Sequence, residues 1–137
     1  KDEQAQISSI IEDRRGWVGL GYRFRRMDVH SKPDIVILKL SRPQMLRRFS
    51  SRPDLAGLSV TSQGVDGSVI YIDDLNWRQV PARFSGTLQT YRQYLVQHEI
   101  GHCLGFEHSP ASTGGAACPV MYQQTRGTVT CRANPWH

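Results

Sequence analysis

The N-terminal part of the chain carries two different hydrophobic periodicities. Residues 4–15 repeat apolar side chains at helical spacing, and Gly16 follows as the end of the predicted helix. The apolar positions of this helix are Ile7, Ile10 and Ile11. In residues 21–28, Tyr22 and Phe24 alternate with arginines, which predicts a half-buried strand. We therefore expect a helix followed by a strand.

The middle of the chain carries the pattern of a sheet. A continuous apolar run at 34–40 predicts a central strand, and residues 58–62 and 68–73 predict two more. The stretch "SQGVDG" between the last two runs has the composition of a hairpin turn. A short helix is expected around 43–49, and residues 76–86 are expected to form a loop. Together these runs predict a mixed, twisted sheet.

A second long helix is predicted to begin at Thr87, a good N-cap residue, and to end at Gly105. Apolar residues cover more than half of its circumference, so we expect this helix to be mostly buried. They are Leu88, Tyr91, Leu95, Val96, Ile100, Cys103 and Leu104. The sequence that follows has little periodicity and predicts loops and turns.

The predicted elements suit one α+β domain over residues 1–137. Its N-terminal part, about residues 1–105, contains the first helix, the sheet and the buried helix. Its C-terminal part, about residues 106–137, is loop-rich. The length of the chain allows a single, small hydrophobic core.

The composition is that of a globular protein, with 39% hydrophobic and 21% charged residues. The net charge of +5 comes mostly from arginines in the N-terminal half. No nucleic-acid-binding module accompanies them, so we interpret them as a solvated basic surface and expect no nucleic-acid partner. An anionic partner such as a cell-wall polymer, an acidic protein or lipid head groups is the alternative. No apolar run is as long as a transmembrane segment, and we expect a monomer.

The three cysteines allow one disulfide bridge and one free thiol. Cys118 and Cys131 lie in loop-like sequence, whereas Cys103 lies inside the predicted helix. We therefore predict a Cys118–Cys131 bridge and a buried Cys103. Such a bridge would place the protein outside the reducing cytosol, either secreted or at the cell surface.

The candidate chemistry lies in "HEIGHCLGFEH", at the end of the predicted buried helix. His98 and His102 are four residues apart, so their imidazoles lie one turn apart on one side of a helix and can share a zinc ion. Gly105 allows a sharp turn that returns His108 as a third ligand, which leaves one zinc position open. Glu99 is placed to act as a general base. A helix that is merely rich in histidine is the alternative, but buried imidazoles and a carboxylate are costly without partners.

This stretch matches the metzincin signature H-E-x-x-H-x-x-G-x-x-H at all five fixed positions. Metzincins also carry a methionine turn below the metal, and "CPVMYQQ" resembles that turn, with Met121 as its methionine. Tyr122 resembles a residue that forms a wall of the substrate pocket in matrix metalloproteinases. The resemblance implies a small metzincin-like fold, one catalytic zinc ion and hydrolysis of peptide bonds.

A closer resemblance, strongest from about residue 87 onward, is to an uncharacterised family of exported actinobacterial metzincin-like domains. It rests on "YRQYLVQHEIGHCLG", "PVMYQQTRG" and "CRANPW". It implies a zinc-dependent endopeptidase that acts on a protein or peptide through a zinc-bound water activated by Glu99. Two other functions remain open: a zinc amidase or peptidase acting on cell-wall peptides, and a non-catalytic metzincin-like binding module.

The resemblance to metzincins also suggests where a substrate lies. In metzincins an edge strand above the cleft pairs with the substrate backbone. We expect residues 68–73 to be this strand, because they form the last predicted strand before the buried helix. An interior strand without substrate contact is the alternative. Tyr71, Phe106 and Tyr122 are the candidate pocket residues.

Overall fold

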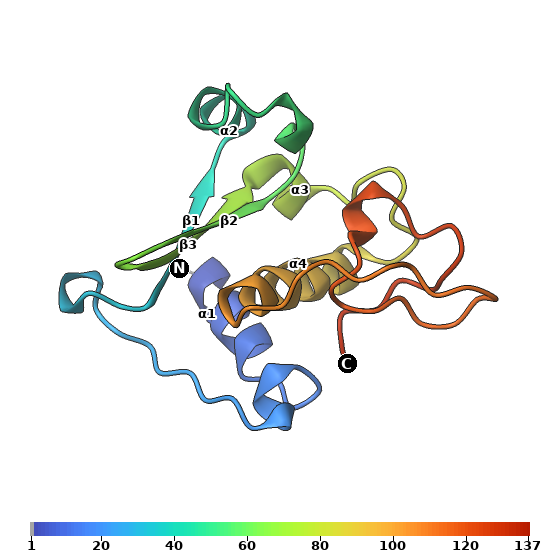
Figure 1. The fold of residues 1–137 in the computed structure, drawn as a ribbon, viewed down its shortest axis with the longest axis horizontal. Coiled ribbons are helices and arrows are strands. Elements are labelled where there is room, and N and C mark those ends of the chain that lie inside the picture. The colour runs from blue at the N-terminus through green and yellow to red at the C-terminus, as the bar shows by residue number, and fades with distance from the viewer. Residues whose placement is uncertain (1) are drawn as a thin grey trace.

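The chain forms four α-helices and a three-stranded mixed sheet in a computed structural model, which describes residues 2–137 (Figure 1). The helices are α1 (Asp2–Ile11), α2 (Arg42–Arg48), α3 (Asp74–Arg78) and α4 (Leu88–Cys103), and the strands are β1 (Ile35–Leu40), β2 (Val60–Gly64) and β3 (Gly67–Asp73). Short 3-10 turns lie at Trp17–Leu20, Val29–Ser31, Pro53–Leu55 and Gln124–Arg126. The predicted α+β class is confirmed.

Strand β3 lies at the centre of the sheet, with β1 parallel on one side and β2 antiparallel on the other. The predicted β2–β3 hairpin is confirmed, and it closes where Gly64 lies opposite Gly67. Gly67 has a φ of +123°, a conformation that favours glycine. The prediction that residues 68–73 form the edge strand is wrong. Although β2 precedes β3 in the sequence, β2 folds outside it and occupies the edge.

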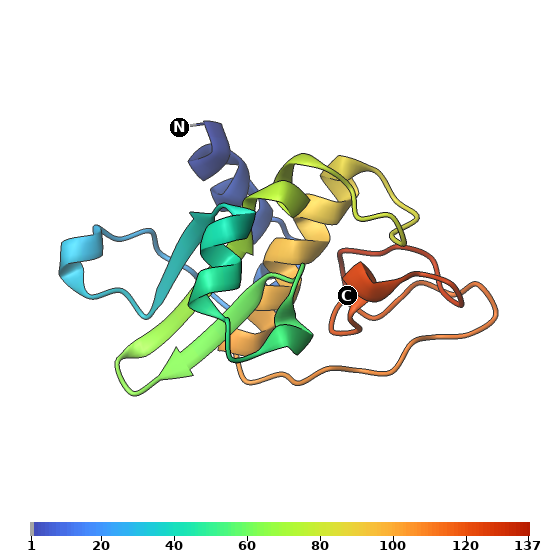
Figure 2. The same cartoon turned by 90° about the horizontal axis from the view of Figure 1, so that it is seen from above.

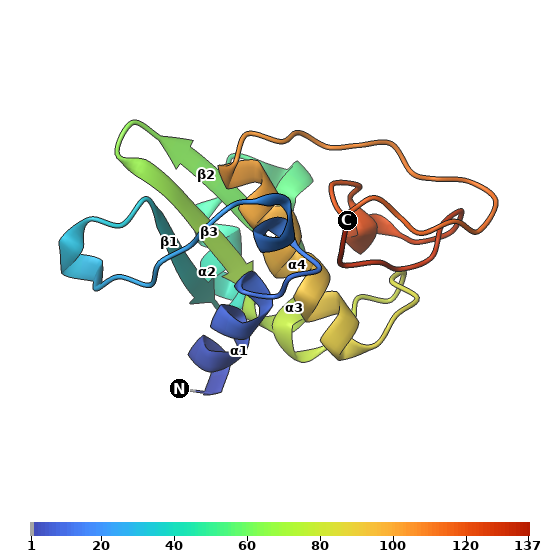
Figure 3. The ribbon, with the colours of Figure 1, turned by 90° about the horizontal axis from the view of Figure 1, so that it is seen from below.

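Helices cover both faces of the sheet. α2 lies on one face, while α1 and α4 lie on the other, as the views from above and below show (Figure 2 and Figure 3). Side chains alternate across β3, so Ile70 and Ile72 join the core that contains α4. Tyr71 instead contacts Phe49 at the end of α2, with ring centroids 5.1 Å apart. The C-terminal loops lie beside α4 and away from the sheet (Figure 1).

Helix α4 is the central helix of the core. The Thr87 side chain caps its start by accepting a hydrogen bond from the Thr90 amide at 3.1 Å. Every residue from Tyr94 to Gly101 is buried. Gly105, with a φ of +97°, allows the sharp turn that follows the helix. The predicted buried helix and its two ends are therefore confirmed.

Helix α3 includes the first residues of the loop predicted for 76–86, which is a correction. Asp73 begins the helix, because its carboxylate accepts hydrogen bonds from the amides of Leu75 at 2.9 Å and Asn76 at 3.2 Å. The same carboxylate is fully buried and pairs with Arg42 of α2 at 2.6 Å. The ion pair joins residues 31 positions apart, so no local sequence pattern predicted it.

The strand predicted for residues 21–28 does not form. The predicted alternation is present nevertheless, since Tyr22 and Phe24 are half-buried against the core and the arginines beside them are exposed. Alternating burial requires only an extended chain lying on a core, whereas a strand also requires a neighbour for its backbone N–H and C=O groups. Residues 21–28 lie extended on the core, but they have no neighbouring strand among the described residues.

A single disulfide links two segments of the C-terminal loops. Cys118 and Cys131 are bridged, with their Cα atoms 4.9 Å apart, and this confirms the predicted pairing. Cys103 is free, as predicted, but it is half-buried where full burial was predicted. No helix within residues 2–137 is long and apolar enough to cross a membrane.

Buried side chains, rather than a sheet, order the rest of the C-terminal part. The side-chain amide of Gln124 donates to the carbonyls of Pro119 at 3.1 Å and Asn134 at 2.7 Å. The Gln124 side-chain carbonyl accepts a hydrogen bond from the Asn134 amide at 3.0 Å. Asn134 in turn donates to the carbonyl of Cys118 at 2.9 Å. These bonds give the loops a defined conformation next to α4.

Candidate metal centre

The end of α4 and the turn that follows it bring three imidazoles together. One ring nitrogen from each of His98, His102 and His108 lies within 4.8 Å of the other two. The Nε2 atoms of His102 and His108 are 3.1 Å apart. Two nitrogens at about 2.0–2.1 Å from one tetrahedral zinc ion lie roughly 3.3 Å from each other, so this spacing suits a shared ion. The three histidines could therefore hold a metal.

Two backbone carbonyls orient the imidazoles. Nδ1 of His98 lies 2.7 Å from the carbonyl oxygen of Val120, and Nδ1 of His102 lies 2.9 Å from that of Phe106. Because a carbonyl oxygen only accepts, each Nδ1 carries the hydrogen, and Nε2 of the neutral ring has the free lone pair. Histidines that bind metals commonly donate their second N–H in this way.

The three histidines of the cluster differ in solvent exposure. His98 is 4% exposed, His102 is half-buried and His108 is exposed. Burial lowers the pKa of His98 to about 3, and burial also lowers the pKa values of His102 and His108. All three imidazoles are therefore neutral near pH 7, which is the protonation state that binds a metal ion.

The Glu99 carboxylate lies on the side of α4 that faces β2. Thr61 of β2 donates a hydrogen bond to Oε1 of Glu99 at 2.5 Å. Burial raises the pKa of the Glu99 carboxyl to about 8, and the bond from Thr61 opposes that shift. Every buried polar side-chain atom within residues 2–137 has a hydrogen-bond partner. Oε2 of Glu99 has no such partner among these residues, so this oxygen is not completely buried.

The turn around Met121 lies directly against α4. Met121 is 5% exposed, and its carbonyl accepts a hydrogen bond from the amide of Ser109 at 2.9 Å. This bond connects the turn to the residue that follows His108. Tyr122 is half-buried, and its carbonyl accepts a hydrogen bond from the Tyr94 hydroxyl of α4 at 3.2 Å. The turn therefore contacts both the helix and the third histidine's segment.

The other two candidate pocket residues lie differently. The Tyr71 ring is on the α2 side of the sheet, where its hydroxyl is 3.4 Å from a guanidinium nitrogen of Arg48. The structure therefore does not bring Tyr71 to the histidines. Phe106 is 41% exposed and its ring stacks on Trp17, with centroids 4.8 Å apart. Its contribution to the histidine cluster is the backbone carbonyl that orients His102.

Comparison with protein families gives a match over nearly the whole chain. The family described as "Protein of unknown function (DUF3152)" matches residues 2–135. The chain belongs to the DUF3152 family. The match includes the three histidines, Glu99 and the disulfide of this DUF3152 chain. No curated protein and no solved structure matches it.

Trp17 supports α4 of this DUF3152 protein, although no sequence pattern identified it. Its indole N–H donates to the carbonyl of Gln97 at 2.8 Å, and its amide donates to the Gln97 side chain at 3.3 Å. The ring also packs against Phe106 and His137, with centroid distances of 4.8 and 4.0 Å. Gln97 was the one sign of this contact in the sequence, because a glutamine inside a buried helix needs a hydrogen-bond partner.

We expect Gly101→Ala to reduce the free energy of unfolding of this DUF3152 protein by about 1–3 kcal/mol, the usual cost of overpacking a core. A Cβ at Gly101 would clash with Sδ of Met121 and lie 2.7 Å from Cζ2 of Trp17. Urea denaturation measures the change. Gly64→Ala is the control, since a Cβ there would lie 3.7 Å from the carbonyl of Gly67. Equal stability of the two variants would contradict the packing described here.

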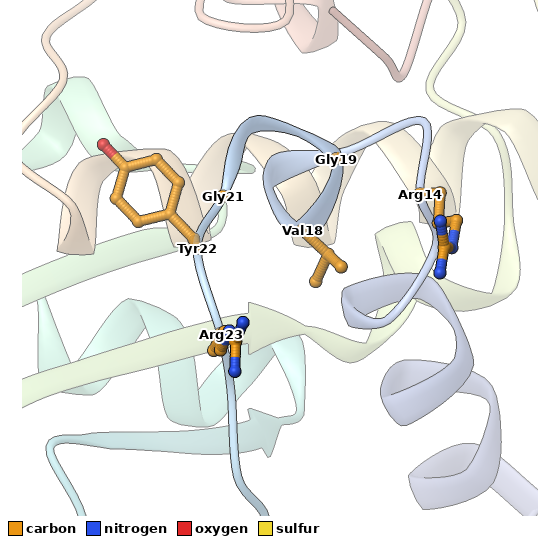
Figure 4. Close-up of a pocket in the computed structure, with 6 residues that line it drawn as sticks. All are labelled: Arg14, Val18, Gly19, Gly21, Tyr22 and Arg23. Atoms are coloured by element: carbon orange, nitrogen blue, oxygen red, sulfur yellow. The ribbon is translucent and has the colours of Figure 1, made fainter.

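A separate cavity lies on the segment that follows α1 (Figure 4). Its volume is about 520 Å³, and it is lined by Arg14, Val18, Gly19, Gly21, Tyr22 and Arg23. The side chains of Arg14 and Arg23 lie at different ends of the segment drawn in Figure 4. The cavity shares no residue with the histidine cluster, so the two are distinct features of this DUF3152 chain.

Proposed function

We propose that this protein is a zinc-dependent endopeptidase of the metzincin type, with Glu99 as its general base. The observation that carries the proposal is the convergence of His98, His102 and His108 on one point, with the Glu99 carboxylate on the next residue of the same helix. Three protein ligands leave one position of a tetrahedral zinc ion free, as in catalytic zinc sites. The metzincin-like signature and methionine turn support peptide-bond hydrolysis as the reaction.

The residues of the cluster fit zinc. Neutral imidazole nitrogens are common zinc ligands, and the 3.1 Å between Nε2 of His102 and His108 is close to the ligand separation in a tetrahedral site. The carbonyls of Val120 and Phe106 are outer partners of the kind that hold ligating imidazoles in place. When bound, zinc supplies a Lewis acid that activates water and polarises the scissile carbonyl.

Glu99 moves the proton in this proposal. Its Oε1 is held by Thr61, and its Oε2 can accept a proton from the attacking water once the carboxyl is ionised. The same oxygen then delivers the proton to the amide nitrogen as that nitrogen leaves. The proton taken from water therefore ends on the new amine, and Glu99 returns to its starting state.

Strand β2 offers a place for a peptide substrate. It is an edge strand, so its outer side has no strand partner within residues 2–137. Thr61 and Gln63 of β2 both hydrogen-bond to α4, at Glu99 and at the carbonyl of His102. A peptide that adds to the outer side of β2 in extended form would therefore run past the metal centre.

The disulfide supports a location outside the reducing cytosol, so we propose a secreted or cell-surface enzyme. The basic composition, with a net charge of +5, suits an anionic cell wall. Peptides of the cell wall are therefore the second candidate substrate, with the same site acting as a zinc amidase or peptidase.

The proposal is tested with the purified, zinc-loaded protein on labelled casein and on peptidoglycan. We expect one bound zinc per chain and cleavage at internal peptide bonds of casein, identified by mass spectrometry. Cleavage of peptidoglycan alone would assign the enzyme to cell-wall peptides. Zinc binding without cleavage of either substrate would contradict the enzymatic proposal and favour a non-catalytic binding module.

A further inference from the structure

The hydroxyl of Thr61 is the hydrogen-bond partner of the Glu99 carboxylate. The 2.5 Å between Oγ1 of Thr61 and Oε1 of Glu99 is in the range of a hydroxyl donating to a carboxylate. The two residues are 38 positions apart in the sequence and lie on different elements, β2 and α4. Within residues 2–137, no other side chain hydrogen-bonds to this carboxylate.

We propose that Thr61 is a positioning residue that orients the Glu99 carboxylate, an inference that rests on the proposed function of Glu99 as the base. With Oε1 held by Thr61, the carboxylate cannot rotate freely, and Oε2 has no hydrogen-bond partner within residues 2–137. A base that is fixed before the substrate binds loses less conformational freedom when it takes the proton. Thr61 itself does not contact the reacting atoms.

The backbone around Thr61 is well placed to hold the hydroxyl still. Thr61 lies opposite Ile70 of the central strand, in the register of the β2–β3 pair. Its side chain is branched at Cβ, which restricts χ1 to few conformations. The same hydroxyl also lies 3.3 Å from the backbone carbonyl of Glu99, so the threonine contacts both the helix backbone and its carboxylate.

Strand β2 holds the Glu99 side chain and is also the edge strand to which we propose that the peptide binds. Gln63, two residues further on, donates to the carbonyl of His102 at 2.7 Å, so two side chains of one strand attach it to α4. Only Thr61 also reaches the carboxylate. A peptide that pairs with β2 would thus be located relative to the same strand that holds Glu99.

The test compares zinc-loaded wild type with Thr61→Val, Thr61→Ser and Thr125→Val. Valine keeps the shape of threonine without its hydroxyl, and serine keeps the hydroxyl. We expect Thr61→Val to lower kcat on a peptide cleaved from casein by about 10- to 100-fold, the effect of losing one hydrogen bond to a charged group. KM and zinc content should stay near wild type. Thr61→Ser should restore most of kcat.

Thr125→Val is the matched control, because it removes a threonine hydroxyl that shares a hydrogen bond with Tyr91 of α4 at 2.8 Å without touching the Glu99 carboxylate. An equal loss of kcat in Thr125→Val, or wild-type kcat in Thr61→Val, would overturn the proposal. Crystal structures of the zinc-loaded proteins give a readout that does not depend on activity. We expect one Glu99 conformer in wild type and Thr61→Ser and a displaced carboxylate in Thr61→Val. If wild type cleaves nothing, the proposed function fails, and an unmoved Glu99 in Thr61→Val separately rejects the role of Thr61.

Discussion

Glu99→Gln is expected to keep its zinc and to hydrolyse casein about 10²–10⁴-fold more slowly than wild type, the usual contribution of a general base. Glutamine has the size of glutamate, and its carbonyl can still accept the hydrogen bond from Thr61. The carbonyls of Val120 and Phe106 orient His98 and His102, and none of the three histidines hydrogen-bonds to Glu99, so they should keep their places. Zinc analysis and initial rates on labelled casein measure the two effects.

Glu107→Gln is the matched control for this experiment. Glu107 lies in the same signature stretch but is exposed, and it forms no hydrogen bond or ion pair in the structure of residues 2–137. Glu107→Gln makes the same change of side chain beside His108 without removing the proposed base, so its rate should stay near wild type. A Glu99→Gln protein that cleaves casein as fast as wild type would show that the assigned mechanism is incorrect.

His102→Ala is expected to lose both metal and activity, in contrast to Glu99→Gln. The variant removes a ligand itself, so zinc affinity should fall by more than the roughly 10–100-fold typical for loss of an outer partner. Zinc at a hundred times its Kd should stabilise wild type by about 2.7 kcal/mol, which raises Tm by roughly 8 °C for a chain of this length. The same zinc concentration should leave the Tm of His102→Ala nearly unchanged.

His30→Ala controls for the general loss of an imidazole, because His30 is exposed and lies outside the cluster. Its zinc content and its Tm shift should match wild type. The measurements are metal analysis after dialysis and thermal denaturation with and without zinc. A full Tm shift in His102→Ala would mean that zinc binds elsewhere, and the site assigned to the three histidines would have to be abandoned.

Local sequence was sufficient to predict the histidine cluster at the end of α4 and the disulfide. The four-residue spacing of His98 and His102 predicts two imidazoles on one side of a helix, and the structure places them there. Gly105 predicts the turn that returns His108, and its φ of +97° is the conformation that glycine favours. The pairing of Cys118 with Cys131 was also predictable, since both lie in loops close in the sequence.

Strand order was predicted incorrectly for a physical reason. The pattern of residues 68–73 indicates a strand, but an apolar run does not say which strands lie beside it. The short β2–β3 hairpin requires only that β2 and β3 are neighbours. The edge position of β2 depends on β1 pairing with the other side of β3, a contact between distant parts of the chain. The strand predicted at 21–28 does not form for the same reason. Pairing depends on distant parts of the chain, and these residues have no partner strand within residues 2–137.

The sequence by itself determined the residues that local geometry controls: the helix that carries His98, Glu99 and His102, the turn to His108, and the disulfide. Periodicity and spacing operate over a few residues, so they are sufficient for such features. Only the tertiary structure decided what surrounds Glu99. Thr61 reaches it across 38 positions, and Trp17 supports the same helix across 80. Contacts of this range arise from the packing of whole elements, which no local pattern encodes.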